Sequence, residues 1–230
     1  MKLIAVETAT EACSAALLID GEVTEQFEFA PRQHTQLILP MVDQLLADAG
    51  LKLADLDGLA FGRGPGAFTG VRIATGVIQG LAFAADLPVA PISTLAAMAH
   101  EQYKKGGQSE ILTAIDARMG EVYWACYECS DEGAKEVVKE QVCPPEQVIL
   151  PESDAWLGLG SGWETYQQEL SNVVGQRVSR VDGTCFPQAR YIAMLAELSV
   201  AQGKALPASQ AMPVYLRDNV AKKKAEQQSS

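Results

Sequence analysis

IAVETATEACSAALL, residues 4–18, contains the pattern that decides the fold. An apolar run ends at Glu7, a short polar turn follows, and a second apolar run begins near Cys13. Two short apolar runs joined by a tight turn are typical of neighbouring β-strands. Asp20-Gly21 predicts a second turn and residues 23–29 a third strand. The chain is therefore predicted to begin with a three-stranded meander.

Residues 113–127, TAIDARMGEVYWACY, repeat this plan, with Asp116 as the acid that ends the first strand. Residues 134–142 form the matching third strand. A repeated unit of this kind indicates an internal duplication, and the helical patterns after each copy predict an α/β fold. We expect two similar lobes, each with a mixed sheet and flanking helices. Their predicted limits are residues 1–105 with part of 205–220 for the N-terminal lobe, 106–204 for a degenerate C-terminal lobe, and 221–230 for a flexible tail.

The remaining elements follow from hydrophobic spacing and from capping residues. Thr35 is the expected cap of an amphipathic helix over residues 35–49, and Ser93 or Thr94 the cap of another. The other predicted elements are strands 56–62, 87–92 and 155–160 and helices 70–85 and 188–202, with a glycine turn at Gly160-Ser161-Gly162 before a short helix.

Composition and charge exclude several classes of protein. The 230 residues carry a net charge of −11, which argues against broad electrostatic wrapping of nucleic acid. Lys222–Lys224 is the one basic run near the C-terminus and is interpreted as a solvated tail. The N-terminal apolar run is interrupted by Glu7, unlike a signal peptide, and no uninterrupted apolar stretch approaches the roughly 18 residues of a membrane span. A cytoplasmic protein is expected.

The five cysteines do not suggest a secreted disulfide framework. Cys126 and Cys129 form a C-x-x-C motif, but they lie in a β-type run, whereas redox motifs of this kind open a helix. A structural zinc ion would need two further ligands. The pair is interpreted as strand cysteines, with metal binding as the alternative.

GRGPGAFTGVRIATG, residues 62–76, has the appearance of a phosphate-binding loop but lacks the required spacing. No Lys-Ser or Lys-Thr follows the glycines, and G-x-G-x-x-G fails at Ala67 and at Thr69. Pro65 also removes one backbone N–H from the turn. The glycines therefore predict a tight strand-to-helix turn.

The helix over 70–85 has two distinct faces. One face suits packing on its own sheet: Ile73, Ala74, Val77, Ile78, Leu81 and Ala85. The other carries Arg72, Thr75, Gly76, Gln79, Gly80 and Phe83. Because Gly destabilises a helix, Gly76 and Gly80 favour close approach of another backbone. Two interpretations stay open: another element of this chain covers the face, or it is a helix-to-helix protein interface with the 35–49 helix beside it.

At these residues the chain resembles the bacterial TsaB (YeaZ) family, which takes part in making N6-threonylcarbamoyladenosine in transfer RNA. The resemblance runs nearly end to end. It also extends, mainly in the first half, to the catalytic paralogue TsaD. The matching stretches are ETATEACS (7–14), PRQHTQLILP (31–40), GRGPGAFTGVRIATGVIQGLA (62–82), IDARMGEVYWA (115–125) and PVYLR (213–217).

The resemblance implies a duplicated actin-like, ribonuclease-H-like fold. In TsaD an H-x-x-x-H pair holds a metal, and the corresponding positions here are Thr94 and Met98. Neither suits a hard or borderline metal ion. His100 is isolated and is expected at the surface or in a cap. No catalytic residue, metal or cofactor is therefore predicted.

The resemblance further implies a non-catalytic subunit that pairs with TsaD, is joined by the ATPase TsaE, and forms a homodimer when alone. It would support threonylcarbamoylation of adenosine 37 in transfer RNAs that read codons beginning with A, touching the RNA only through the complex. The predicted interface residues are Leu37, Met41, Arg72, Gly76, Gln79, Gly80 and Phe83.

The alternative is an ATP-binding enzyme with Mg-ATP in the cleft between the lobes. Its candidate residues are Glu7, Thr8, Thr10, Asp116, Gly160, Ser161 and Gly162. Arg118 is the one cation evident near these turns, and the first turn has no glycine to admit phosphates. Glu7 and Asp116 are also well suited simply to cap their own turns.

Overall fold

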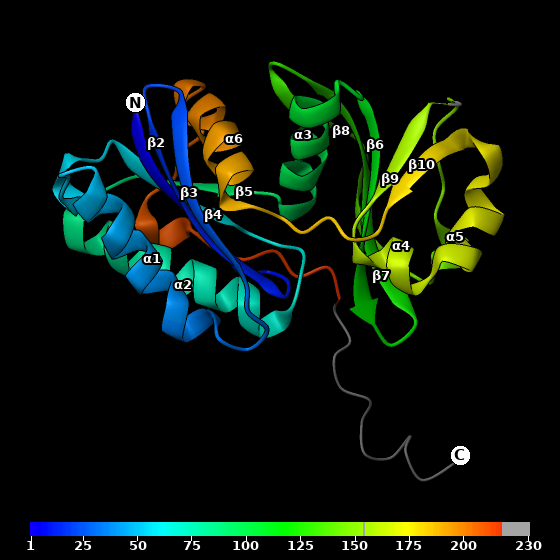
Figure 1. Cartoon of the computed structure of the whole chain (residues 1–230), viewed down its shortest axis with the longest axis horizontal. Coiled ribbons are helices and arrows are strands. Elements are labelled where there is room, and N and C mark those ends of the chain that lie inside the picture. Colours follow the sequence, from blue (N-terminus) through cyan, green and yellow to red (C-terminus); the bar gives the residue numbers. More distant parts are fainter. Residues whose placement is uncertain (154, 218–230) are drawn as a thin grey trace, which may run out of the picture.

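The structure is a computed structural model that describes residues 1–153 and 155–217. Figure 1 shows two lobes side by side, each built on one sheet. In the first lobe the sheet order is β3-β2-β1-β4-β5. The strands β1, β2 and β3 form the predicted antiparallel meander, and β4 and β5 run parallel to β1. The strands of this sheet are β1 (Lys2–Glu7), β2 (Ala12–Ile19), β3 (Glu22–Phe29), β4 (Gly58–Gly62) and β5 (Val89–Ile92).

The second sheet repeats this topology strand for strand. Its order is β10-β9-β6-β7-β8, again with an antiparallel meander joined to two parallel strands. The predicted duplication and the actin-like, ribonuclease-H-like fold are thus confirmed. The strands are β6 (Glu110–Arg118), β7 (Glu121–Ser130), β8 (Gly133–Cys143), β9 (Trp156–Leu159) and β10 (Val178–Asp182).

Helices cover the outer face of each sheet. On the first lobe, α1 (His34–Asp48) and α2 (Phe68–Ala85) pack against the sheet through a core that includes Ile38, Leu45 and Ile78. On the second lobe, α4 (Ser161–Thr165) and α5 (Gln167–Val174) cover the outer face, where Trp156 and Trp163 are buried. Short 3-10 helices lie at Leu53–Asp55, Pro145–Gln147, Gly175–Arg177 and Ala208–Gln210.

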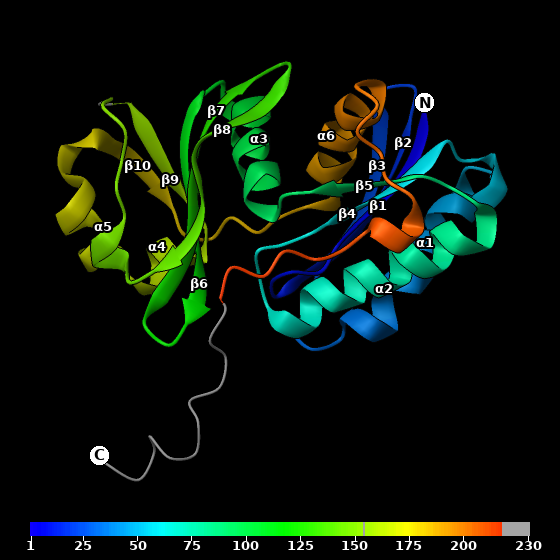
Figure 2. The same ribbon diagram turned by 180° about the vertical axis from the view of Figure 1, so that it is seen from behind.

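Two helices lie between the lobes, and each packs on the sheet of the lobe that does not immediately precede it in the chain. The helix α3 (Thr94–Gly106) follows the first sheet in the chain but packs on β6, β7 and β8 of the second. The helix α6 (Ala189–Ala201) follows the second sheet but packs on β1, β2, β4 and β5 of the first. Figures 1 and 2 show both helices between the sheets, where they also contact each other. The lobe limits given from the sequence remain a prediction, and the predicted tail with Lys222–Lys224 lies outside the described residues.

Several local predictions need correction. Thr35 lies inside α1, whose N-cap residue, Gln33, makes no side-chain capping bond. Ser93 does cap α3, since its hydroxyl accepts the N–H of Ala96 at 3.0 Å. The elements α5 and β10 were not predicted. Residues 167–182 are largely polar, and β10 is a half-exposed edge strand, so neither gives a strong periodic signal.

Cys126 and Cys129 are both buried in β7 but belong to different core clusters. Residues three apart on a strand point to opposite faces of the sheet. This geometry supports the interpretation as strand cysteines, because the two thiols do not face one common point.

By length and composition, α2 is the one helix in the described ranges that could span a bilayer, and 33% of its 18 residues are buried. The buried residues pack on the first sheet, in contact with β1, β4 and β5. The apolar composition of α2 is therefore accounted for in part by the face that packs in the core of the first lobe.

Candidate functional site

The acids that end β1 and β6 occupy equivalent turns. Glu7 accepts the N–H of Ala9 at 2.6 Å, and Asp116 accepts the N–H of Arg118 at 2.7 Å. Each carboxylate therefore bonds the backbone two residues further on, as in an Asx-type turn. The shared geometry confirms the predicted correspondence between the turns and gives both acids a turn-capping role.

Glu7 is completely buried, and its second oxygen accepts the hydroxyl of Thr94 at 2.9 Å. Burial disfavours the ionised form and raises the pKa of Glu7 to about 7, while the hydrogen bonds from Ala9 and Thr94 oppose the shift. Thr94 is the first residue of α3, so this hydrogen bond joins the first sheet to a helix packed on the second.

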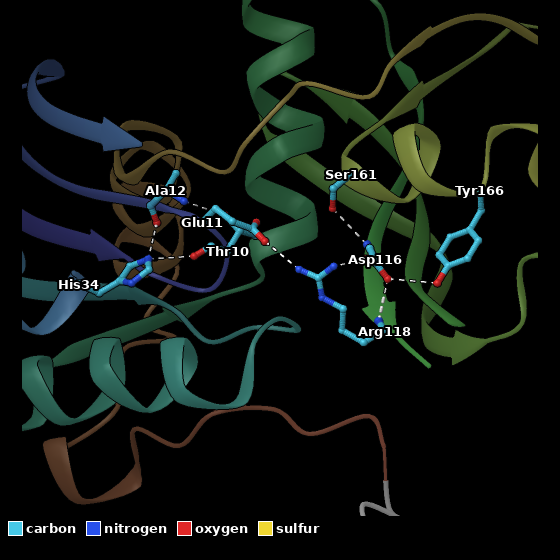
Figure 3. Close-up of polar contacts among 8 residues, drawn as sticks. All are labelled: Thr10, Glu11, Ala12, His34, Asp116, Arg118, Ser161 and Tyr166. Atoms are coloured by element: carbon cyan, nitrogen blue, oxygen red, sulfur yellow. Dashed lines mark hydrogen bonds and ion pairs between the residues drawn. The ribbon is translucent and has the colours of Figure 1, made fainter. Parts of the chain in front are cut away.

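Around Asp116 the second lobe forms a polar cluster, shown in Figure 3. The N–H of Asp116 donates to Ser161 Oγ at 3.1 Å, and Tyr166 donates to the carboxylate at 3.3 Å. The Arg118 guanidinium pairs with Asp116 at 2.7 Å and crosses the cleft to Glu11 at 3.1 Å. The cation nearest the cleft is thus already engaged by two carboxylates.

The glycines of the second turn serve packing. A Cβ on Gly160 would lie 2.5 Å from the carbonyl oxygen of Ala114, and one on Gly162 would lie 2.9 Å from it. Both glycines therefore let α4 approach β6. Of the nucleotide candidates, Thr10, Asp116 and Ser161 line a cavity of about 540 Å³ between the lobes, whereas Glu7, Gly160 and Gly162 do not. Thr8 lies beside a neighbouring cavity.

A prediction follows for the bridge between the lobes. Because the Arg118 side chain is 72% exposed, solvent screens its ion pairs with Glu11 and Asp116. Arg118→Gln is expected to lower the free energy of unfolding by at most about 1 kcal/mol, with a smaller difference at high salt. Urea denaturation of both proteins at low and high salt measures this. A loss of several kcal/mol would show that the bridge holds the lobes together.

The first glycine stretch packs tightly on the β1–β2 turn. The N–H of Ala67 donates to the carbonyl of Ala9 at 2.7 Å, and a Cβ on Gly70 would lie 2.1 Å from the Thr8 carbonyl oxygen. His34, which was not among the predicted site residues, contacts the same turn. Its Nε2 lies 2.9 Å from the Thr10 carbonyl and 3.2 Å from that of Ala12 (Figure 3). The contacts of the stretch agree with structural roles for its glycines.

The exposed side of α2 has an open stretch near its C-terminal end. Phe83 is 88% exposed. Gly76 and Gly80 are also exposed, and apart from the backbone of α2 itself no heavy atom of the described residues lies within 4 Å of the point that a Cβ would occupy. Part of the face is covered by this chain: Gln79 donates to the carbonyl of Ala211 at 2.7 Å. This contact supports the first interpretation for part of the face. An open strip around Gly76, Gly80 and Phe83 remains, and the interface interpretation of that strip stays a prediction.

Two side-chain orientations differ from those expected. Thr75 is buried and donates to the Val71 carbonyl at 2.7 Å, so it does not belong to the exposed face. Met41 is 7% exposed and packs in the core beneath α1. Leu37, on the same helix, is half-buried.

Arg72 lies at the N-terminal end of this face, where two aromatic rings hold it. Its guanidinium stacks 3.1 Å from the centroid of Phe68 and 4.6 Å from that of Tyr215. Tyr215 belongs to the C-terminal segment, whose Val214 N–H donates to the carbonyl of Arg63 at 2.8 Å. The same segment reaches the second lobe, where Arg217 pairs with Glu121 and donates to the Arg118 carbonyl at 3.2 Å.

The positions that correspond to the paralogue's metal ligands have other contacts here. Thr94 bonds Glu7, and Met98 lies in the core shared by the two lobes. His100 was expected at the surface but is 1% exposed, and its Nδ1 has no hydrogen-bond partner among the described residues. Burial lowers the pKa of His100 to about 4, which favours the neutral ring.

Comparison with known proteins settles the family. The chain is 46% identical to the Escherichia coli protein named tRNA threonylcarbamoyladenosine biosynthesis protein TsaB, with 97% of this chain and 98% of that protein covered. The chain belongs to the TsaB family. The Haemophilus influenzae TsaB is 44% identical over 97% of each chain. The Pseudomonas aeruginosa YeaZ structure matches with a TM-score of 0.87 and 46% identity, covering 94% of this chain and 99% of that one.

The wider relationship is also evident. Residues 22–225 match the family model described as TsaD, tRNA N6-adenosine threonylcarbamoyltransferase. Most of the chain is therefore similar to a family model of a transferase, in addition to its similarity to the TsaB relatives.

Proposed function

We propose that this chain is a non-catalytic subunit in threonylcarbamoyladenosine biosynthesis, which binds and supports a TsaD-type catalytic subunit. The reaction served is threonylcarbamoylation of adenosine 37 in transfer RNAs that read codons beginning with A. The near full-length similarity to TsaB proteins supports the pathway. A TsaE-type ATPase joins the complex, and transfer RNA is bound through the complex in the cytoplasm.

The open strip on α2 is the observation that carries the docking role. Gly76 and Gly80 are one turn apart, are exposed, and have free space above them. Small residues at this spacing let a second helix approach closely, and the exposed Phe83 ring beside them supplies apolar area to bury. A helix of the catalytic subunit fits here, and the same strip pairs two copies of this chain when that subunit is absent.

The interface is proposed to include Leu37, Arg72, Gly76, Gln79, Gly80 and Phe83. Met41 is not part of the proposed contact surface, because its side chain is buried in the core beneath α1. The polar groups of the interlobe turns are already bonded within the chain: Asp116 and Glu11 to Arg118, and Glu7 to Ala9 and Thr94. These bonds support a partner role over Mg-ATP binding at the turns.

Gly80→Glu is expected to abolish co-purification with the TsaD-type subunit. A buried, unpaired carboxylate at a helix–helix contact is costly, and the longer side chain prevents close approach, so we expect affinity to fall at least about tenfold. The fold is expected to persist because no atom from outside α2, within the part of the chain that the structure describes, lies within 4 Å of the Cβ position. Affinity chromatography and size-exclusion chromatography of the mixed proteins measure the effect.

Gln168→Glu is the matched control, because it adds the same charge on exposed α5 of the other lobe. It is expected to co-purify normally. Normal co-purification of Gly80→Glu would exclude this strip as the interface. A reconstituted modification assay with and without this chain tests the supporting role separately, and unchanged modification without it would contradict that role.

A further inference from the structure

The cavity between the lobes is lined by several aromatic side chains. Its volume is about 540 Å³, within the range of ligand-binding sites. Both lobes and the C-terminal segment contribute to it. Five aromatic side chains line it: Phe29, Phe68, Tyr123, Phe186 and Tyr215.

The rings have free surface. Phe29 is 57% exposed, Phe68 58% and Tyr215 45%. Phe29 and Phe186 form a pair with ring centroids 5.2 Å apart, which fixes one wall. The Arg72 guanidinium already lies over the Phe68 and Tyr215 rings, 3.1 Å and 4.6 Å from their centroids, so this cluster accommodates an organic cation within the chain itself.

Charged groups in the lining are predominantly acidic. The carboxylates are Glu11, Asp116 and Glu164, and the cations are Arg118 and Arg217. Both arginines are engaged, Arg118 by Glu11 and Asp116, and Arg217 by Glu121. Glu164 is exposed, and its carboxylate has no hydrogen bond or ion pair within residues 1–153 and 155–217. Among the lining residues that the structure describes, a phosphate would therefore meet a free carboxylate and no free cation, whereas a cation would meet a carboxylate and the faces of aromatic rings.

We propose that the interlobe cavity binds a cationic side chain, arginine or lysine, presented by a protein partner. The cation lies against the aromatic wall and pairs with Glu164. The net charge of −11 attracts such a partner at long range. This site goes beyond the α2 docking strip, since it is formed by other residues, and it is testable on the isolated chain.

The test is an NMR titration of the full chain at low ionic strength with acetyl-Gly-Arg-Gly-amide, using the neutral acetyl-Gly-Gln-Gly-amide as the matched peptide. The arginine peptide is expected to bind saturably and at least about fivefold more tightly than the glutamine peptide. Glu164→Gln and Phe29→Ala are each expected to weaken arginine-peptide binding by about fivefold. Both residues are exposed, so the fold tolerates the changes.

Glu132→Gln and Phe27→Ala are the controls, because they alter an exposed acid and an exposed ring outside the cavity. Neither is expected to change the affinity. Equal binding of the two peptides, or unchanged binding by Glu164→Gln and Phe29→Ala, would overturn the proposal. Tighter binding of Mg-ATP than of the arginine peptide would also overturn it, in favour of a nucleotide. None of these results bears on the α2 interface, which Gly80→Glu tests independently.

Discussion

Gly70→Ala is expected to lower the free energy of unfolding by about 3 kcal/mol or more. The added Cβ would lie 2.1 Å from the carbonyl oxygen of Thr8 and 3.2 Å from the Cα of Ala9. Both are backbone atoms, so no side-chain rotation relieves the overlap. The same approach allows the Thr8 hydroxyl to donate to the Gly70 carbonyl at 2.7 Å, and that buried hydrogen bond would be lost with it.

Gly76→Ala is the matched control, further along the same helix. Its Cβ would meet no atom of residues 1–153 or 155–217 from outside α2 within 4 Å. Because Ala also has the higher helix propensity, the free energy of unfolding is expected to rise by up to about 1 kcal/mol. Urea unfolding followed by circular dichroism measures both variants. If the midpoint of urea unfolding is the same for Gly70→Ala as for the wild type, the tight contact between the glycine loop and the β1–β2 turn does not stabilise the fold.

Glu7→Gln is expected to remove a pH dependence of stability. The pKa of Glu7 is raised from 4.5 to about 7 by burial. The folded protein therefore binds more protons than the unfolded chain between these pH values. The resulting stabilisation is fully present below about pH 4.5 and is lost as pH rises through about 7, an effect of order 3 kcal/mol.

Gln retains an oxygen that can accept the Ala9 N–H and cannot ionise. The variant and the wild type are therefore expected to be similar in stability at pH 5, with the variant gaining relative stability towards pH 8. Denaturant unfolding of both proteins across this range gives the difference directly and cancels other titrating groups, including His100. Exposed Glu132→Gln serves as the control and is expected to follow the wild type. Parallel curves for wild type and Glu7→Gln would contradict the buried, protonated state.

Much of the fold follows from sequence because its strongest signals are local. Each strand-acid-turn-strand unit carries its own turn chemistry, and the two carboxylates of Glu7 and Asp116 indeed bond the backbone two residues on. The glycine stretch could be separated from phosphate-binding loops by its spacing alone. The same reasoning located the strand before it and the helix after it, with boundaries a few residues from those observed.

Features that depend on contacts between distant segments were not predictable in this way. The burial of Met41, Thr75 and His100 depends on which sheet or helix packs against the helix that carries each residue. The hydrophobic pattern of a helix does not identify the element that packs against it. The role of His34 depends on two carbonyls more than twenty residues earlier in the chain. The interlobe cavity joins residues from both halves, so no single stretch of sequence indicates its aromatic wall.

The exchange of α3 and α6 has a consequence for how this chain folds. Each lobe lacks a cover for its inner sheet face until the other lobe supplies the helix, and the residues involved form one continuous buried cluster. A half-chain would leave that apolar surface in water, so we expect neither lobe to fold on its own. The duplication visible in the sequence is thus expected to fold as one cooperative structure, whose two halves acquire their stability together.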